Sequence, residues 1–427
     1  MTSIEKKRVI SNFLSLSTLQ GLNYLLPLIT LPYLVRVLGA EYFGLLAFAT
    51  AVIMYFSLIT DFGFNISATK EVSIHRDNQD KLSEIFSSVM TIKVFLLFGT
   101  LSILSLLVYF FDRFTHNAFI YFITFGIVIG QVLFPVWFFQ GMENMKFITY
   151  LNILSKLFFT VSVFVFVHKQ EDYWIVPMLT SFGYILAGFI SIYIVKVKFK
   201  IKYQIPSIDS LKFHTKESSY FFISNIAGSL YTVSVTVILG IFTNNTIVGY
   251  YAAADKIIQA FKGLVTPFMQ AIYPYVSRQV NISQTNGIKI IKKIALGTFI
   301  VMGVISFGVF LFSELLVNII LGEGYMESVI ILQLLSPLPL LVAMGNVFGL
   351  QTMIPFGRKK QFSTIIVSGS FISLLISFTL VPIYFQVGSA ISLILTEIII
   401  ATTMFIYLQR SGLKLIGISN ESQKDMN

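Results

Sequence analysis

The chain has 427 residues, of which 56% are hydrophobic and only 12% are charged, so it is not an ordinary soluble domain. Its apolar residues could fill about twelve membrane-spanning helices of roughly 20 residues, which leaves almost nothing for an extramembrane domain. The absence of cysteine excludes disulfides, thiolate metal sites and thiol chemistry. The net charge of +10 is spread over short loops between apolar runs, which indicates membrane orientation rather than nucleic-acid binding.

In chain order, the apolar runs predict an all-α membrane protein with two groups of six spans. Lys6, Lys7 and Arg8 precede the first span, and no convincing small-residue cleavage site follows, so we interpret it as uncleaved. The spans of an N-terminal bundle (1–195) are predicted at 9–34, 42–64, 89–111, 117–139, 148–167 and 174–195. Those of a C-terminal bundle (220–408) are predicted at 220–242, 247–273, 290–312, 328–348, 363–381 and 387–408. The remaining segments are an interfacial helix at 65–87, a Lys-rich cytoplasmic linker at 196–219 and a cytoplasmic tail at 409–427.

The distribution of lysine and arginine supports this topology. With the N-terminus inside, 23 of the 30 basic residues fall in predicted cytoplasmic segments and 3 in outer loops. Because short loops rich in lysine and arginine stay cytoplasmic, both termini are predicted to be cytoplasmic.

A weak internal repeat relates the two predicted bundles. The string FGLLAFAT at 43–50 matches VGYYAAAD at 248–255, an offset of 205 residues. Since each bundle has an even number of spans, such a repeat predicts a pseudo-two-fold axis along the membrane normal.

Polar residues recur on single faces of the first two spans of each bundle, at helical spacing. We expect these faces to line one central hydrophilic cavity, although hydrogen bonds between helices explain isolated Ser, Thr and Asn equally well. The stripes are Gln20, Asn23, Pro27 and Thr30; Thr50, Ser57 and Asp61; Asn225, Ser229, Thr232 and Thr236; and Asp255, Gln259, Lys262 and Thr266.

Charged residues inside spans are costly and therefore favour a functional interpretation. Lys262 and Asp255 are expected to line the cavity, unless Asp255 only pairs with Lys262 or Lys256. For Lys156, one turn after Asn152, a position lining the cavity and a purely structural role are equally favoured.

Three further charges in spans have structural interpretations. Lys93 is expected to snorkel to the cytoplasmic interface, and Asp61 to pair with Lys70 unless it couples transport to an ion. Glu397 is expected at a peripheral helix interface.

Catalytic and metal-binding motifs are missing from the sequence. The four histidines are predicted in loops without metal-ligand spacing, and no P-loop, GxSxG or HExxH motif occurs. No cofactor is expected. The histidines are His75, His116, His168 and His214.

Several strings resemble one known family of membrane proteins over nearly the whole chain. The sequence resembles Wzx-type O-antigen flippases, a branch of the multidrug/oligosaccharidyl-lipid/polysaccharide exporter superfamily. The strings are LPYLVRVLGAEYFG (31–44), DFG (61–63), KEV (70–72), WFFQGMENM (137–145), VGYYAAA (248–254), Tyr273-Pro274, SPLP (336–339) and Gln351.

The resemblance implies a V-shaped pair of six-helix bundles in the bacterial inner membrane. Such proteins move glycan repeats linked to undecaprenyl pyrophosphate to the periplasmic leaflet by alternating access. On this basis Lys262 and Lys156 would contact the pyrophosphate oxygens of the substrate. The cavity that holds the substrate would also be lined by Gln259, Asn225, Ser229, Gln20 and Asn23. Asp255 and Asp61 would carry the coupling ion, H⁺ or Na⁺.

The resemblance also suggests a monomer whose further partners are a polysaccharide polymerase and a chain-length regulator. Two other functions stay open. A multidrug exporter of the same superfamily would need an acidic rather than mixed cavity. A polysaccharide polymerase would need a large outer loop with paired arginines, which the predicted loops do not provide.

Overall fold

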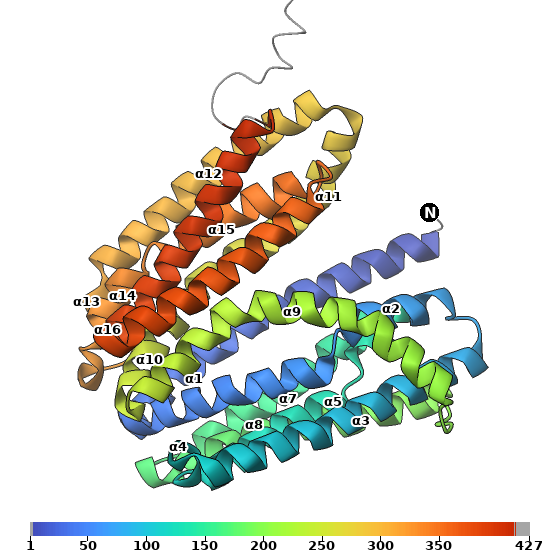
Figure 1. Ribbon diagram of the computed structural model, residues 1–427, viewed down its shortest axis with the longest axis horizontal. Helices are drawn as coiled ribbons and strands as arrows, with labels where there is room; N and C mark the ends of the chain where they lie inside the picture. The colour runs from blue at the N-terminus through green and yellow to red at the C-terminus, as the bar shows by residue number, and fades with distance from the viewer. Residues whose placement is uncertain (1–2, 414, 416–427) are drawn as a thin grey trace, which may run out of the picture. The chain divides into compact units, whose positions relative to one another are not determined.

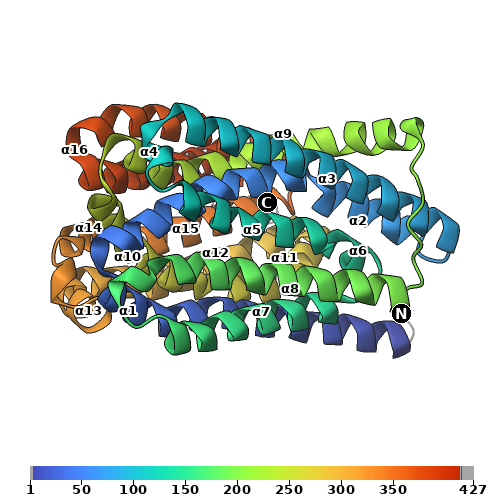
Figure 2. The same cartoon turned by 90° about the horizontal axis from the view of Figure 1, so that it is seen from below.

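The computed structural model of the chain describes the backbone of residues 3–413 and 415; the side chains of residues 3–25, 223–225, 227 and 230–232 lie outside its description. The part described is helical and contains no strand, as the composition predicts. It divides into two compact units, Met1–Ile226 and Ala227–Asn427. Figures 1 and 2 show the helices of each unit.

The first unit contains long helices joined by short connections. Helices α3, α5, α7 and α8 run side by side, and α1 packs on α3, α5 and α7 (Figures 1 and 2). The elements are α1 (Ser3–Asp61), α2 (Phe64–Ile74), α3 (Gln79–Phe110), α4 (Asp112–Thr115), α5 (Ala118–Leu133), α6 (Val136–Gly141), α7 (Met145–Phe166), η1 (Gln170–Trp174), α8 (Ile175–Lys198) and most of the first half of α9 (Ile208–Phe242).

The second unit is built in the same way. Helix α15 packs on α12 and α16 (Figure 1), and α10 packs on α14, α15 and α16. The elements after α9 are α10 (Asn245–Gly263), α11 (Val265–Ile282), α12 (Gln284–Leu311), α13 (Ser313–Ile320), η2 (Glu323–Tyr325), α14 (Ser328–Leu335), α15 (Leu338–Phe348), the π-helical η3 (Gly349–Met353) and α16 (Lys359–Arg410).

Helices lie at all the predicted spans, but their boundaries differ. Predicted spans 1 and 2 form one element, α1, broken at Gly39, whose φ of 70° favours glycine. Spans 11 and 12 likewise form α16, broken at Phe385 three residues after Pro382. The predicted interfacial helix 65–87 is wrong as one element, because a turn around His75 and Asn78 separates α2 from α3.

Eight helices in the described part are long and apolar enough to cross a membrane. Helices α10 and α11 are not among them, and α9 contributes only a shorter apolar stretch, Val233–Phe242. These are the predicted spans 7 and 8, which carry two of the four polar stripes. The polar residues of α10 and α11 lower the mean hydropathy of these two helices.

Small residues bring α5 and α8 into close contact. A Cβ at Gly130 would collide with the backbone of Tyr184, and one at Gly126 would lie 2.6 Å from Cβ of Ser181. The Ser181 hydroxyl donates to the carbonyl of Ile123 on α5 at 2.6 Å. Between membrane helices, which gain little from the hydrophobic effect, such close packing and hydrogen bonding provide the cohesion.

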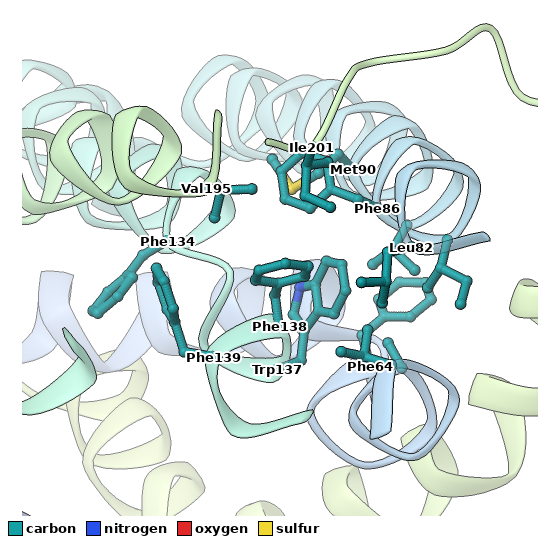
Figure 3. Packing of buried hydrophobic residues seen from close by; sticks show 14 of the residues in the cluster. Phe64, Leu82, Phe86, Met90, Phe134, Trp137, Phe138, Phe139, Val195 and Ile201 are labelled. Atoms are coloured by element: carbon teal, nitrogen blue, oxygen red, sulfur yellow. The ribbon is translucent and has the colours of Figure 1, made fainter. Parts of the chain in front are cut away.

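The WFF part of the motif at 137–145 lies in an aromatic core. Trp137, Phe138 and Phe139 are fully buried on α6, where they pack with Phe64 of α2 and Phe86 of α3 (Figure 3). Burying an aromatic side chain contributes roughly 1.5–3 kcal/mol. This motif, which carries much of the family resemblance, therefore stabilises the first unit.

The segment predicted as a linker is attached to the first unit by hydrogen bonds. Gln79 donates to the carbonyl of Phe199 at 2.6 Å, and the Ser87 hydroxyl accepts from the backbone N–H of Gln204 at 2.9 Å. Further along, the hydroxyls of Ser67 and Ser218 lie 2.6 Å apart. Through these contacts the segment 199–218 packs on α2 and α3.

One predicted loop histidine is instead buried on a helix of this segment. His214 lies on α9, is 5% exposed, and is close to the Lys81–Glu84 ion pair, whose atoms are 2.8 Å apart. Burial, together with the positive charge of Lys81, lowers the pKa of His214 to about 4, and the opposing effect of Glu84 is smaller. His214 is therefore neutral at physiological pH.

Candidate transport site

The first unit holds a pair of opposite charges at the junction of α1 and α2. Asp61 is the last residue of α1, and its carboxylate accepts a hydrogen bond from Asn65 at 2.7 Å. The charge acting on it is that of Lys93 from α3, which is only 4% exposed. The expectations that Lys93 snorkels and that Asp61 pairs with Lys70 are both wrong, since Lys93 is buried and Lys70 is exposed.

The pair lies next to a point where the backbone comes unusually close. A Cβ at Gly63 would lie 2.8 Å from the carbonyl oxygen of Ser218, and Gly63 has a φ of 79°. Phe62 stacks on Phe222 with their ring centroids 4.6 Å apart. The start of α9 therefore packs against the turn that carries Asp61.

Lys156 lies elsewhere in the first unit, half-buried on α7. Asn152, one turn earlier, donates to the carbonyl of Ile148 on its own helix at 2.8 Å. This is the local hydrogen bond to the preceding turn that Asn commonly makes within a helix.

In the second unit, Asp255 is bonded to the glutamine one turn later. Gln259 donates to the Asp255 carboxylate at 2.5 Å, and Asp255 is half-buried while Gln259 is exposed. Neither Lys256 nor Lys262 forms an ion pair with Asp255 in the part of the chain that the structure describes. The interpretation in which Asp255 serves only to cancel a lysine charge is therefore wrong.

Lys262 lies at the end of α10, and its positive charge is within electrostatic reach of Glu397 on α16, without an ion pair within 4 Å among the described residues. Glu397 is 7% exposed and no hydrogen bond from a described residue reaches it. Its carboxylate was expected at a peripheral interface, but it lines a cavity of about 120 Å³ together with Asn346 of α15.

A second cavity adjoins the first. It has a volume of about 300 Å³, and the two share Asn346 and Leu350. Thr266 and Gln270 of α11 and Gln351 of η3 also line it. Gln351 is 1% exposed and donates to the carbonyl of Met269 at 2.8 Å, while its own oxygen has no partner in the protein.

Other predicted site residues are only partly described. The side chains of Gln20, Asn23 and Asn225 lie outside the described residues. Ser229 is half-buried on α9. Among the described residues, the structure therefore joins Asp255 to Gln259 by a hydrogen bond, and it places Asp61 within electrostatic reach of Lys93 and Glu397 within electrostatic reach of Lys262.

Lys93 and Glu397 were set aside in the sequence analysis, although a charge within an apolar span was a signal for both. Their burial depends on neighbouring helices that are distant in sequence. No group of three acidic or histidine side chains suited to a metal occurs among residues 3–413 as described.

Comparison with known proteins identifies the class. Residues 9–280 match the model of the family described as polysaccharide biosynthesis protein. Two proteins named "Putative O-antigen transporter" align over nearly their whole length. The protein from Escherichia coli (strain K12) is 35% identical, and the alignment covers 94% of this chain and 97% of that protein. The protein from Shigella dysenteriae is 31% identical, and the alignment covers 92% of this chain and 98% of that protein.

Solved structures share the fold. The inward closed conformation of the lipid II flippase MurJ has a TM-score of 0.71 at 15% identity, covering 94% of this chain and 87% of its own. An inward-facing MATE multidrug resistance transporter has a TM-score of 0.69 at 12% identity, and the match covers 92% of this chain and 96% of that transporter.

The chain belongs to the polysaccharide biosynthesis protein family, and its long apolar helices are those of a multi-pass membrane protein. The resemblance deduced from its motifs is confirmed. The two curated relatives are named as transporters, not as enzymes.

Proposed function

We propose that the protein translocates polysaccharide repeat units, such as those of O-antigen, linked to undecaprenyl pyrophosphate, from the cytoplasmic to the periplasmic leaflet. The observation that carries this proposal is Glu397, a buried carboxylate that lines a cavity within a membrane-spanning helix of a polysaccharide-family protein. A charge inside a membrane helix costs at least about 2.5–3.5 kcal/mol, so its retention favours a role in binding or coupling. Lys262 supplies the cation for a pyrophosphate group, assisted by Lys156.

In this proposal the chain crosses the bacterial inner membrane twelve times, with both termini in the cytoplasm. The six-helix bundles 1–195 and 220–408 are related by a pseudo-two-fold axis and alternate in access, joined through the linker 196–219. Gln259, Asn225, Ser229, Gln20 and Asn23 line the substrate path. The protein acts as a monomer and passes its product to a polymerase and chain-length regulator.

A cation gradient, H⁺ or Na⁺, drives transport in this proposal, and no cofactor takes part. Asp61 and Asp255 are the coupling candidates, to which the buried carboxylate of Glu397 is added. The positive charge of a nearby lysine favours the ionised form of a carboxylate. When that lysine binds an anion, the carboxylate loses this support and binds a cation or proton more readily.

The test is deletion of the gene in its host, followed by profiling of surface polysaccharide and of lipid-linked repeats. Loss of polymer with single repeats trapped on the cytoplasmic leaflet supports the proposal, and the wild-type gene should restore export. Normal polymer with altered drug tolerance would instead identify a multidrug exporter.

A further inference from the structure

A groove on the second unit shares no lining residue with the two cavities described above. It has a volume of about 460 Å³ and runs between α11 and α12. Val265 and Phe268 form its α11 side, and all its other lining residues but two are apolar. The two exceptions are Lys293 and Thr298, both on α12.

The polar and apolar residues of the groove follow one another in a definite order. Lys293, Gly297, Val301 and Ile305 recur every four residues and so form one row along α12. From Lys293 to Ile305 this row extends about 18 Å, over half the thickness of a bilayer core. The row therefore presents an amine at one end and hydrocarbon along the rest.

Thr298 adds an unpartnered hydroxyl between the two ends. It is 7% exposed, and its oxygen has no hydrogen-bond partner in the protein. It lies about 7.5 Å along the helix from Lys293. In a helix, threonine adopts either of two χ1 rotamers, so a ligand in the groove can be met by a change in the direction of this hydroxyl.

We propose that the α11–α12 groove binds an anionic glycerophospholipid. The phosphate contacts the Lys293 amine, an ester carbonyl accepts a hydrogen bond from Thr298, and one acyl chain lies along Val301 and Ile305. The order amine, hydroxyl and hydrocarbon matches the order phosphate, ester and acyl chain in such a lipid. A polyprenyl phosphate also has a phosphate and a hydrocarbon chain, but it has no ester carbonyl for Thr298.

The basic character of the adjoining helix start favours an anionic lipid over a zwitterionic one. Lys289 and Lys292 precede Lys293 within about one turn. Near a membrane surface, each such lysine attracts anionic lipid electrostatically. This inference is independent of the substrate that the protein transports.

The experiment uses the purified full-length protein, freed of lipid in detergent and then mixed with phosphatidylglycerol or phosphatidylcholine. Retained lipid is counted by native mass spectrometry, and the thermal midpoint is measured alongside. Phosphatidylglycerol should be retained and should raise the midpoint, because a ligand that binds only the folded state stabilises it. Equal retention of the two lipids would identify general annular lipid and overturn the proposal.

A glycine pair on α12 provides a matched test of the groove. A Cβ at Gly297, which lines the groove, or at Gly303, which does not, meets no atom within 4 Å. Gly297→Leu should fill the groove and abolish selective retention, whereas Gly303→Leu should leave it unchanged. Equal effects of the two variants would overturn the proposal.

Two further variants test the polar contacts without filling the groove. Lys293→Gln should weaken phosphatidylglycerol binding about tenfold. Lys360→Gln, at an exposed lysine of α16, should leave this binding unchanged. Thr298→Val, which keeps the shape, should weaken binding about three- to tenfold. If a polyprenyl phosphate displaces phosphatidylglycerol, and equally well from Thr298→Val, the occupant is the transport carrier and the proposal is wrong.

Discussion

Asp61 at the end of α1 and Lys93 of α3 act on each other electrostatically inside the first unit, and Lys93 is 4% exposed. A buried charge that loses its partner is costly, about 3–5 kcal/mol when both are fully buried. Because Asp61 is only half-buried and keeps its hydrogen bond from Asn65, Lys93→Met should lower the free energy of unfolding by less than this. Thermal midpoints of the detergent-purified protein measure this change.

The double variant Asp61→Asn with Lys93→Met separates stability from transport. It should recover most of the lost stability, because no unpaired charge remains, but it should not restore polysaccharide export. Lys70→Gln is the control, as Lys70 is exposed one turn beyond Asn65 and should behave as wild type. Export by the double variant would remove the pair from coupling.

Replacing Glu397 or Lys262 tests whether these charges in the second unit are needed for transport rather than for folding. Glu397→Gln keeps the size of a 7% exposed side chain and removes its charge, so the protein should remain as abundant in the membrane as wild type. Export should fall at least tenfold, as it should for Lys262→Ala. Glu314→Gln, at an exposed carboxylate on α13, is the control. Surface polymer is the readout, and full export by both variants would contradict the proposed role.

The Asp255–Gln259 bond predicts a different result on the two faces of α10. Asp255→Ala should lose export while retaining its membrane level, whereas Lys256→Gln should not, because Lys256 is exposed on another face. A cysteine at Ser229 should react with an aqueous thiol reagent if α9 lines the substrate path. Complete protection of that cysteine would instead favour a hydrogen bond between helices.

The close approach of α5 and α8 predicts a strong effect of a single methyl group. Gly130→Ala places a Cβ against the Tyr184 backbone, which cannot move like a side-chain end, so it should destabilise by about 1–3 kcal/mol. Gly99→Ala on α3 meets no atom within 4 Å and should be neutral or slightly stabilising. The thermal midpoint of Gly130→Ala should therefore lie clearly below that of Gly99→Ala. Equal midpoints of the two variants would contradict the close packing of α5 and α8.

His214 predicts a dependence of stability on pH. Its folded pKa of about 4 lies below the usual value of 6.5, so the unfolded chain binds a proton over this interval that the folded chain does not. Stability should fall as pH drops from 6.5 towards 4, by up to about 3 kcal/mol. His214→Gln should flatten this decline in thermal midpoint; an unchanged slope would mean that other groups cause it.

Sequence patterns identified the helices well but not their ends. Length and hydropathy placed a helix at every predicted span, because any backbone in hydrocarbon must satisfy its own hydrogen bonds. The breaks at Gly39 and Phe385, and the extension of α3 back to Gln79, were missed. These depend on what packs against each helix end.

The sequence by itself determined the membrane class, the helical fold and the family, because composition, periodicity and short motifs are properties of the chain alone. It also found Asp61, Asp255 and Lys262 as charges in apolar surroundings. Helical spacing already placed Gln259 beside Asp255, but only the tertiary structure brought Lys93 near Asp61 and Glu397 near Lys262. The physical reason is that the cost of a buried charge depends on every helix around it, and helix packing brings together residues as far apart as α10 and α16.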